Sequence, residues 1–356
     1  RNIVKLSKIK VLIYALLIIV CYSSIAWAKA TTTELNNIGQ LAVTSIDNGG
    51  KLLFSDSPEL VDKDGIMYAD TIQGIARLYC YHVNNTNSPK RIFILLENNS
   101  AEGVSVEVGK YGLAQPSADY LAVGKQVQVD YFKSRNSYIV YVPPKSVRVL
   151  SKDMAKMIAT KDMLVHGMFD INAEKPITVK FVMMAANGEI ENLAKNLKIL
   201  PADQWRLRGT FEHMNRLIIG KGKYDNNNKP VLINLADNNF DKYIEGIDAT
   251  DGSKTQNYGN YGLLYRVYIP TKGQGSINYY LQPRGGVYAG ALKIEQNYSK
   301  NILKLTPSKQ TCFGDKDMLD MEWLGEYAVG EPLSFYFMPP GASNLPVALA
   351  LVPKKS

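Results

Sequence analysis

The sequence predicts an all-β protein made of two β-sandwich domains, Ig-like or jelly-roll-like, with minor helices, behind an N-terminal export signal. Three observations support this prediction. Short runs in which aromatic and β-branched residues alternate with polar ones recur from residue 51 to residue 352, as in half-buried strands. Clusters of Gly, Asn, Asp and Pro separate these runs and are typical of turns. A basic segment followed by an apolar one opens the chain.

The first 28 residues have the three parts of a secretory signal peptide. Residues 5–10 are basic, residues 11–22 are apolar, and Ala26 and Ala28 form a small-residue cleavage pattern. We expect cleavage after Ala28, which makes the protein secreted or places it at the cell surface. The alternative is an uncleaved anchor, because residues 11–28 carry no charge. Such an anchor would be the protein's only contact with a membrane.

The composition predicts a folded chain and argues against nucleic acid as a partner. Hydrophobic residues make up 46% of the 356 residues and charged ones 21%, which suits two ordinary cores. The formal net charge is +8, but removal of the four positive charges in residues 1–28 lowers it to +4. No basic cluster stands out in the remainder. Nothing in the sequence indicates a cofactor.

Two cysteines follow the signal, Cys80 in the first predicted domain and Cys312 in the second. An oxidising compartment would allow them to pair, but two buried thiols are the simpler expectation. We therefore expect hydrophobic cores, rather than a disulfide framework, to hold the domains together.

Residues 45–198 are expected to form the first domain, after a polar lead-in over residues 29–44. Five strands are predicted over residues 74–83, 138–142, 146–150, 164–170 and 177–184. Residues 91–97 and 104–108 are predicted to pair as a hairpin across a polar turn. Pro143 and Pro144 suit a bend between strands, because proline donates no hydrogen bond to a ladder.

Two helices are predicted in this first domain. Ser117 is expected to cap a helix that places Tyr120, Val123, Val127 and Tyr131 on one stripe, although residues 127–131 also alternate like a strand. Residues 187–200 are predicted to form the second helix, with Asn187 as its cap and Pro201 beyond its end. Residues 152–158 suit a helical turn.

Residues 203–354 are expected to form the second domain. Its clearest feature is three strand-like runs, 262–270, 276–282 and 286–295, which are predicted to form an antiparallel meander. Residues 236–258 are rich in Asp, Asn and Gly and are predicted to be a long ordered loop. Strands over 333–338 and 347–352 flank Pro339 and Pro340, which repeats the strand, double proline, strand pattern of the first domain.

Catalytic and metal motifs find little support in the sequence. His82, His166 and His213 are far apart and are expected to be ordinary strand or loop residues. Asp248 and Asp251 lie in a short oxygen-rich stretch that weakly resembles a calcium loop, but it lacks the alternating ligands and the distant Glu of that motif. The simpler interpretation is that these aspartates form turns.

The candidate contact surface lies in the second domain, because long polar loops on a stiff sandwich are common recognition sites. Tyrosines near such a loop can stack on sugar or peptide groups, although strand alternation sends half of them into the core. The proposed binding residues are Asp248, Asp251, Tyr258, Asn260, Tyr261, Arg284 and Tyr288. No catalytic residue is proposed.

Several runs in the chain, including residues 55–59, 247–253, 257–262, 283–290 and 339–346, resemble a family of exported bacterial proteins. Some members carry, and are labelled after, a copper-amine-oxidase-like N-terminal domain. The resemblance covers residues 51–353 and implies no activity, and the appended domain is absent here. Oxidase chemistry is not expected, because Tyr258, Tyr279 and Tyr298 lack the Asn-Tyr-Asp/Glu context of the cofactor tyrosine and no histidine pair is present.

We therefore expect a non-enzymatic binding or structural module associated with the cell envelope, with a cell-wall polysaccharide or another envelope protein as its partner. A carbohydrate hydrolase that uses Asp or Glu is one alternative, and two carboxyl groups facing each other in a cleft would favour it. A calcium-dependent adhesin is the other alternative.

Overall fold

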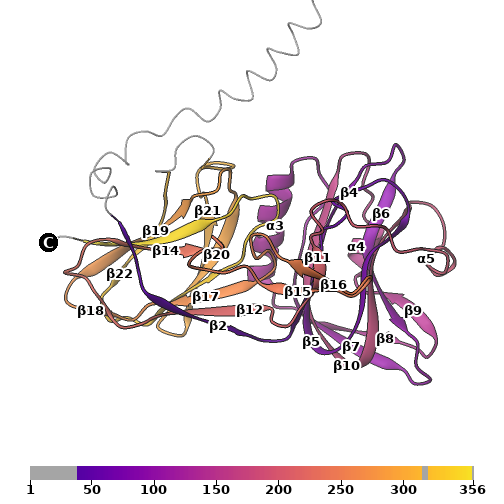
Figure 1. The fold of residues 1–356 in the computed structure, drawn as a ribbon, viewed down its shortest axis with the longest axis horizontal. Helices are drawn as coiled ribbons and strands as arrows, with labels where there is room; N and C mark the ends of the chain where they lie inside the picture. Colours follow the sequence, from indigo (N-terminus) through magenta and orange to yellow (C-terminus); the bar gives the residue numbers. More distant parts are fainter. Residues whose placement is uncertain (1–37, 315–319, 355–356) are drawn as a thin grey trace, which may run out of the picture. The chain divides into compact units, whose positions relative to one another are not determined.

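β-Sheet dominates the described residues, 38–314 and 320–354, of the computed structural model (Figure 1). This confirms the all-β prediction, with three short or medium helices among the described residues. The predicted signal peptide lies outside the described residues. Within them, no helix combines the length and apolar character that crossing a membrane requires.

An eleven-stranded sheet contains most of the first half of the chain. Its order is β16-β15-β11-β3-β5-β10-β6-β9, with β4 on β5, β7 on β10, and β8 on β7. The bounds are β3 (Lys51–Ser55), β4 (Leu60–Val61), β5 (Gly65–Asn84), β6 (Lys90–Asn98), β7 (Val104–Leu113), β8 (Tyr138–Val142), β9 (Ser146–Val149), β10 (Leu164–Ala185), β11 (Arg208–Phe211), β15 (Glu245–Asp248) and β16 (Ser253–Gln256).

Two long strands, β5 and β10, form the spine of this sheet. They pair antiparallel over most of their length, with a register break between Ala173 and Ile177. On the other edge of β10, β7 pairs before the break and β6 pairs after it. Residues 91–97 and 104–108 are therefore strands, but the predicted hairpin between them is wrong, because each pairs with β10 instead. The double proline separates β8, which pairs with β7, from β9, which pairs with β6.

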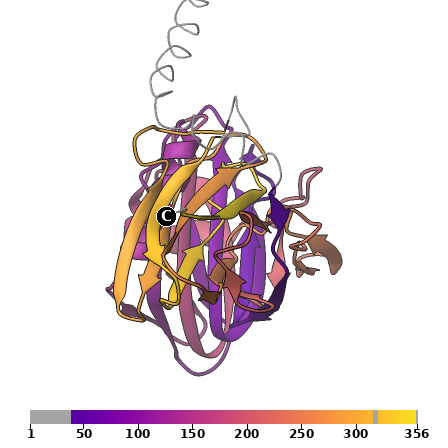
Figure 2. The ribbon, with the colours of Figure 1, turned by 90° about the vertical axis from the view of Figure 1, so that its left-hand side faces the viewer.

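Two further sheets form a β-sandwich from the second half. Four strands of the five-stranded sheet run in the order β14-β24-β19-β22, and the side chain of Gln40, at the end of β1 (Gly39–Gln40), accepts a hydrogen bond from Asn234 of β14. The six-stranded sheet runs β2-β12-β17-β23-β20-β21, and a small pair is formed by β13 (Tyr224–Asp225) and β18 (Thr271–Lys272). The remaining bounds are β2 (Val43–Asn48), β12 (Asn215–Gly220), β14 (Val231–Leu235), β17 (Leu264–Tyr268), β19 (Ser276–Pro283), β20 (Gly290–Gln296), β21 (Lys300–Thr306), β22 (Glu322–Ala328), β23 (Leu333–Phe337) and β24 (Val347–Pro353). Figure 2 shows the later of these strands, from β17 to β24, in orange and yellow, from the end that carries the C-terminus.

The meander predicted over residues 262–295 is wrong, although its three strands exist. β17 and β20 belong to the six-stranded sheet, whereas β19, which lies between them in sequence, belongs to the five-stranded sheet. Successive strands therefore face each other across the sandwich. Alternation alone predicts strands but does not say which strands pair, because an inward face looks the same in either sheet.

The alternative between helix and strand near residues 117–132 is resolved in favour of a helix, and two five-residue helices follow it. α3 (Tyr120–Lys133) buries Val123, Val127 and Tyr131, as the stripe predicts, but its cap is Asp119 rather than Ser117. α4 (Lys152–Lys156) is the predicted helical turn. The helix predicted over residues 187–200 is wrong in extent, because α5 (Ile190–Ala194) spans five residues.

The two halves of the chain share strands. β2 precedes the first half but joins the six-stranded sheet, whereas β11, β15 and β16 follow the predicted boundary and join the eleven-stranded sheet. α3 contacts both groups, and Gln128 on it accepts a hydrogen bond from the Ala291 amide in β20 at 2.8 Å. The two-domain division at residues 198–203 stays a prediction, but each half contributes strands to a sheet of the other half.

Candidate functional site

A cleft of about 440 Å³ opens between the β11–β12 connection and the loop that leads into β15. Six of its eleven lining residues come from residues 236–258, the segment predicted from sequence to form the contact surface. The lining residues are Asp47, Phe211, Glu212, His213, Arg216, Asn238, Lys242, Tyr243, Ile244, Glu245 and Gln256. Aromatic, amide and carboxylate side chains thus meet in one cleft.

Aromatic side chains gather on the loop side of the cleft. The rings of Tyr243 and Tyr258 meet edge to face with centroids 6.0 Å apart, and Tyr258 is 51% exposed. Burial raises the pKa of Tyr243, and the charges of Asp237 and Asp241 raise it further. Tyr243 is therefore a neutral phenol at physiological pH, able both to stack and to donate a hydrogen bond.

Asn260 ties the loop that carries these rings to the sandwich below. Its side-chain oxygen accepts from the Ile244 amide at 2.9 Å, and its nitrogen donates to the Lys242 carbonyl at 3.1 Å and to the Tyr265 hydroxyl at 2.7 Å. Asn260 is fully buried and has a positive φ of 52°. It therefore supports the cleft from behind rather than facing a ligand.

Arg216 pairs with two carboxylates at the base of the cleft. Its guanidinium makes two bonds to Asp47, at 2.6 and 2.9 Å, and one to Asp241 at 2.6 Å. Burial raises the pKa of Asp241, while Arg216 and the Tyr265 hydroxyl act to lower it. The remaining charged side chains at the cleft are those of Glu212, Lys242 and Glu245, so the wall presents two carboxylates beside one ammonium group.

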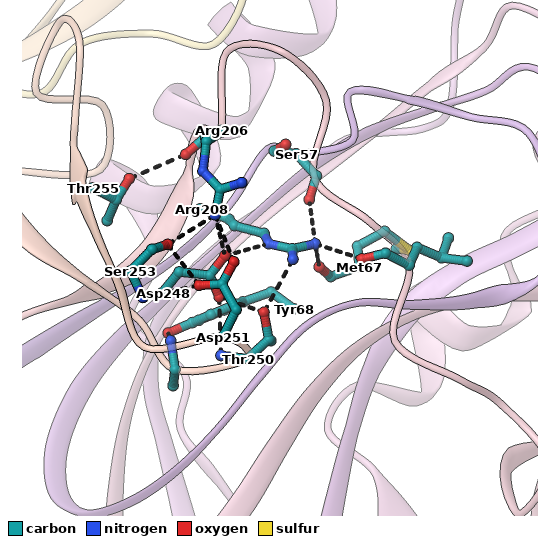
Figure 3. Close-up of polar contacts among 12 residues, drawn as sticks. Ser57, Met67, Tyr68, Arg206, Arg208, Asp248, Thr250, Asp251, Ser253 and Thr255 are labelled. Atoms are coloured by element: carbon teal, nitrogen blue, oxygen red, sulfur yellow. Dashed lines mark hydrogen bonds and ion pairs between the residues drawn. The ribbon is translucent and has the colours of Figure 1, made fainter.

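The two aspartates considered as calcium ligands are engaged by arginines (Figure 3). Arg208 donates to buried Asp248 at 2.8 Å, and Arg206 donates to Asp251 at 2.6 Å. The hydroxyls of Thr250 and Ser253 donate to the same carboxylates. Among the described residues, no group of three His, Cys, Asp or Glu side chains is placed to hold a metal ion. The turn interpretation of this stretch matches the β15–β16 hairpin.

The other proposed binding residues lie away from the cleft lining. Tyr261 donates to the Ser343 carbonyl at 2.6 Å, and Tyr288 is fully buried against Phe313. Arg284 is exposed and donates to Gln282 at 3.2 Å. Of the seven residues proposed from sequence, Tyr258 adjoins the cleft through its contact with Tyr243, and Asn260 supports it from behind through Ile244 and Lys242.

Sequence reasoning missed the cleft wall opposite this loop and the individual residues on the loop itself. Glu212 and His213 follow a short strand and carry no motif, while Tyr243, Glu245 and Gln256 fall within a segment recognised only by its turn-rich composition. His213 lines the cleft, whereas His82 and His166 are buried in the strands predicted for them. The Glu212-His213 pair at a strand end was the available signal, but without strand order it could not be placed opposite Tyr243.

Comparison with known proteins finds little similarity. No protein-family model matches the chain, and no curated protein matches it. Among solved structures, the N-terminal CBM22-1–CBM22-2 tandem domain of Xyn10C from Paenibacillus barcinonensis is 9% identical, with 89% of this chain and 99% of that chain covered and a TM-score of 0.16. Oxalate decarboxylase from Bacillus subtilis at pH 4.6 is 10% identical, with 87% and 77% covered and a TM-score of 0.13. At such scores neither likeness assigns a fold family or an activity to this chain.

Proposed function

We propose that this protein is a non-enzymatic binding module that takes a carbohydrate segment in the cleft beside Tyr243. The observation that carries the proposal is the set of side chains that line this cleft, on a loop held by buried hydrogen bonds. Tyr243 and Tyr258 offer ring surface, and Asn238, Glu245 and Gln256 offer the donors and acceptors that sugar hydroxyls require. Its volume of about 440 Å³ falls within the usual range for small-ligand sites.

The support beneath the cleft favours binding with little rearrangement. Asn260, Arg216 and Asp241 fix the loop through buried hydrogen bonds of 2.6 to 3.1 Å. A pre-ordered loop loses less conformational freedom when a ligand arrives, which improves affinity for a given set of contacts. The export signal predicted over residues 1–28 would place this module at the cell envelope, where polysaccharide is abundant.

The test measures binding of the mature chain to isolated cell-wall polysaccharides and defined oligosaccharides by titration calorimetry. We expect Tyr243→Ala and Tyr258→Ala each to weaken binding about tenfold, which corresponds to the loss of about 1.4 kcal/mol of stacking. Tyr298→Ala is the matched control, because Tyr298 is 68% exposed in the turn after β20. Equal affinity of all three variants and the wild type would exclude the cleft as the site.

A hydrolase is the second candidate, because Glu212 and Glu245 line the same cleft. Glycosidases use two carboxyl groups on either side of the scissile bond. The discriminating measurement is release of reducing ends from the polysaccharide that binds. Product formation that Glu212→Gln or Glu245→Gln abolishes, with binding retained, would establish the hydrolase and overturn the non-enzymatic proposal.

A further inference from the structure

One row of paired residues crosses the outer face of the six-stranded sheet from edge to edge. The register places in this row Ile46, Leu217, Arg266, Tyr336, Lys293 and Leu303, one on each strand. Their sequence neighbours Tyr265, Phe335 and Ile294 are buried in the sandwich core. Because side chains alternate along a strand, the row points to the opposite face. All six residues are half-buried or exposed.

Tyr336 stands at the centre of this row, between two cations. The Lys293 ammonium lies 4.1 Å from the Tyr336 ring centroid, and the Arg266 guanidinium carbon lies 5.8 Å from it. Contacts of this kind hold cations over an aromatic ring and limit their freedom. Arg266 also donates to the Ser334 hydroxyl at 3.1 Å. Two positive groups are thus held side by side on a flat sheet face.

Positive charge exceeds negative charge at this centre. Glu295 is the carboxylate beside it and lies 3.8 Å from Arg266. Burial lowers the pKa of Lys293, and the positive charges of Lys110 and Arg266 lower it further, while Glu295 opposes them. Lys110 and Arg266 therefore both disfavour the charge on Lys293, and Glu295 favours it. An anion bound here would relieve this repulsion.

We propose that this face binds an acidic polysaccharide, with Arg266 and Lys293 pairing with carboxylates along the glycan and Leu217 and Leu303 flanking them with apolar surface. Arg266 and Lys293 lie on strands on either side of β23, and their charged groups lie 5.8 and 4.1 Å from the same Tyr336 ring centroid, so the two charges are at most about 10 Å apart. This separation suits two charges spaced along a polymer. A nucleic acid carries one charge per roughly 1.7 Å of its axis and needs a longer basic stripe. The proposal uses no residue of the cleft and does not depend on the cleft's function.

The test titrates the mature chain with polygalacturonate and, in parallel, with uncharged dextran. We expect the wild type to bind polygalacturonate but not dextran, with affinity falling as salt rises. Arg266→Gln/Lys293→Gln should weaken binding at least tenfold. The matched control Lys133→Gln/Arg135→Gln removes the same charge from two exposed residues at and after the end of α3 and should bind like the wild type.

Three results would overturn the proposal. The first is failure of the wild type to bind polygalacturonate at low salt, and the second is an equal loss in the control pair. The third is tighter binding to phosphatidylglycerol vesicles or single-stranded DNA that Arg266→Gln/Lys293→Gln abolishes, because the occupant would then be a membrane or a nucleic acid. If the double variant misfolds by circular dichroism, Lys293→Gln alone must show the loss. Tyr258→Ala should leave polygalacturonate binding unchanged, which separates this face from the cleft.

Discussion

Arg77 and Asp170 lie directly opposite each other on β5 and β10, and their side chains form a two-bonded ion pair of 2.7 and 3.0 Å. The same guanidinium donates to the carbonyls of Met214 and Gly262, at 2.6 and 3.1 Å, and to the Tyr131 hydroxyl at 2.9 Å. Arg77 is 1% exposed. One side chain of the eleven-stranded sheet therefore satisfies backbone groups from the second half of the chain.

Replacement of Arg77 should destabilise the folded protein. Arg77→Met leaves the Asp170 carboxylate without its ion pair and removes the donors to two carbonyls, so we expect a loss of about 3 to 5 kcal/mol in the free energy of unfolding by urea. Arg148→Gln is the control, because the pair between Arg148 and Glu191 is exposed. That change should cost less than about 1 kcal/mol. If Arg77→Met and Arg148→Gln lost similar amounts of unfolding free energy, the buried contacts of Arg77 would contribute no more than an exposed ion pair does.

Gly124 of α3 is the second point where the two halves depend on each other. A β carbon at this position would lie 1.9 Å from the carbonyl oxygen of Gly341, in the segment between β23 and β24. Alanine normally favours a helix by about 1 kcal/mol over glycine. We nevertheless expect Gly124→Ala to lower the melting temperature, because backbone must move to admit the methyl group.

Gly222→Ala is the matched control for Gly124→Ala, since a β carbon at Gly222 meets nothing within 4 Å. It should leave the melting temperature unchanged or slightly raised. A more stable Gly124→Ala variant would mean that α3 and the Gly341 segment are not held together as the structure shows.

Acid should weaken the fold through two buried histidines. Burial lowers the pKa of His82 and of His166 to about 4, while an unfolded histidine titrates near 6.5. The unfolded chain therefore binds more protons than the folded chain between these values, and stability falls as the pH falls through that window. Each shift corresponds to a loss of up to about 3 kcal/mol. Urea unfolding measured from pH 7 down to about pH 4 checks this.

His166→Phe should reduce the pH dependence by about half, because one of the two titrating groups is gone. His166 packs against Tyr79 with ring centroids 4.7 Å apart, so a phenyl ring keeps the aromatic contact. Asp56 has the opposite effect on stability. Burial raises the pKa of its carboxyl group, so the stability that Asp56 contributes at low pH is lost as the pH rises above the pKa of this group in the unfolded chain. A pH dependence in His166→Phe as large as that of the wild type would contradict the histidine account.

The sequence could predict strands but not their partners. Val231–Leu235 and Leu333–Phe337 follow directly from alternation and from flanking turn residues. Which sheet each strand joins depends on contacts between distant residues, as when Leu264–Tyr268 pairs with Asn215–Gly220 in parallel. Local patterns carry no information about such pairs, and this is why the meander and the hairpin were placed wrongly.

The candidate site shows the same limit. Composition identified residues 236–258 as a surface segment, and six residues of that segment line the cleft. The opposite wall, Phe211 to His213, lies about thirty residues earlier and gave no sign of facing Tyr243. The arginine at the base of the cleft was also missed, because Arg216 looks like an ordinary strand residue until its carboxylate partners are known.

Calcium provides the last test, because it bears on whether Asp248 and Asp251 act as ligands or as ion-pair partners. With Arg208 and Arg206 donating to these carboxylates, a cation would have to displace guanidinium groups, one of them buried. We expect calcium chloride and EDTA to leave the melting temperature unchanged. Asp248→Asn should destabilise by about 3 kcal/mol or more, because it leaves Arg208 buried without a counter-charge. Asp251→Asn, at the exposed end of the same hairpin, should have the smaller effect. A melting temperature that rises with calcium in the wild type but not in Asp248→Asn would overturn this account and establish the adhesin alternative.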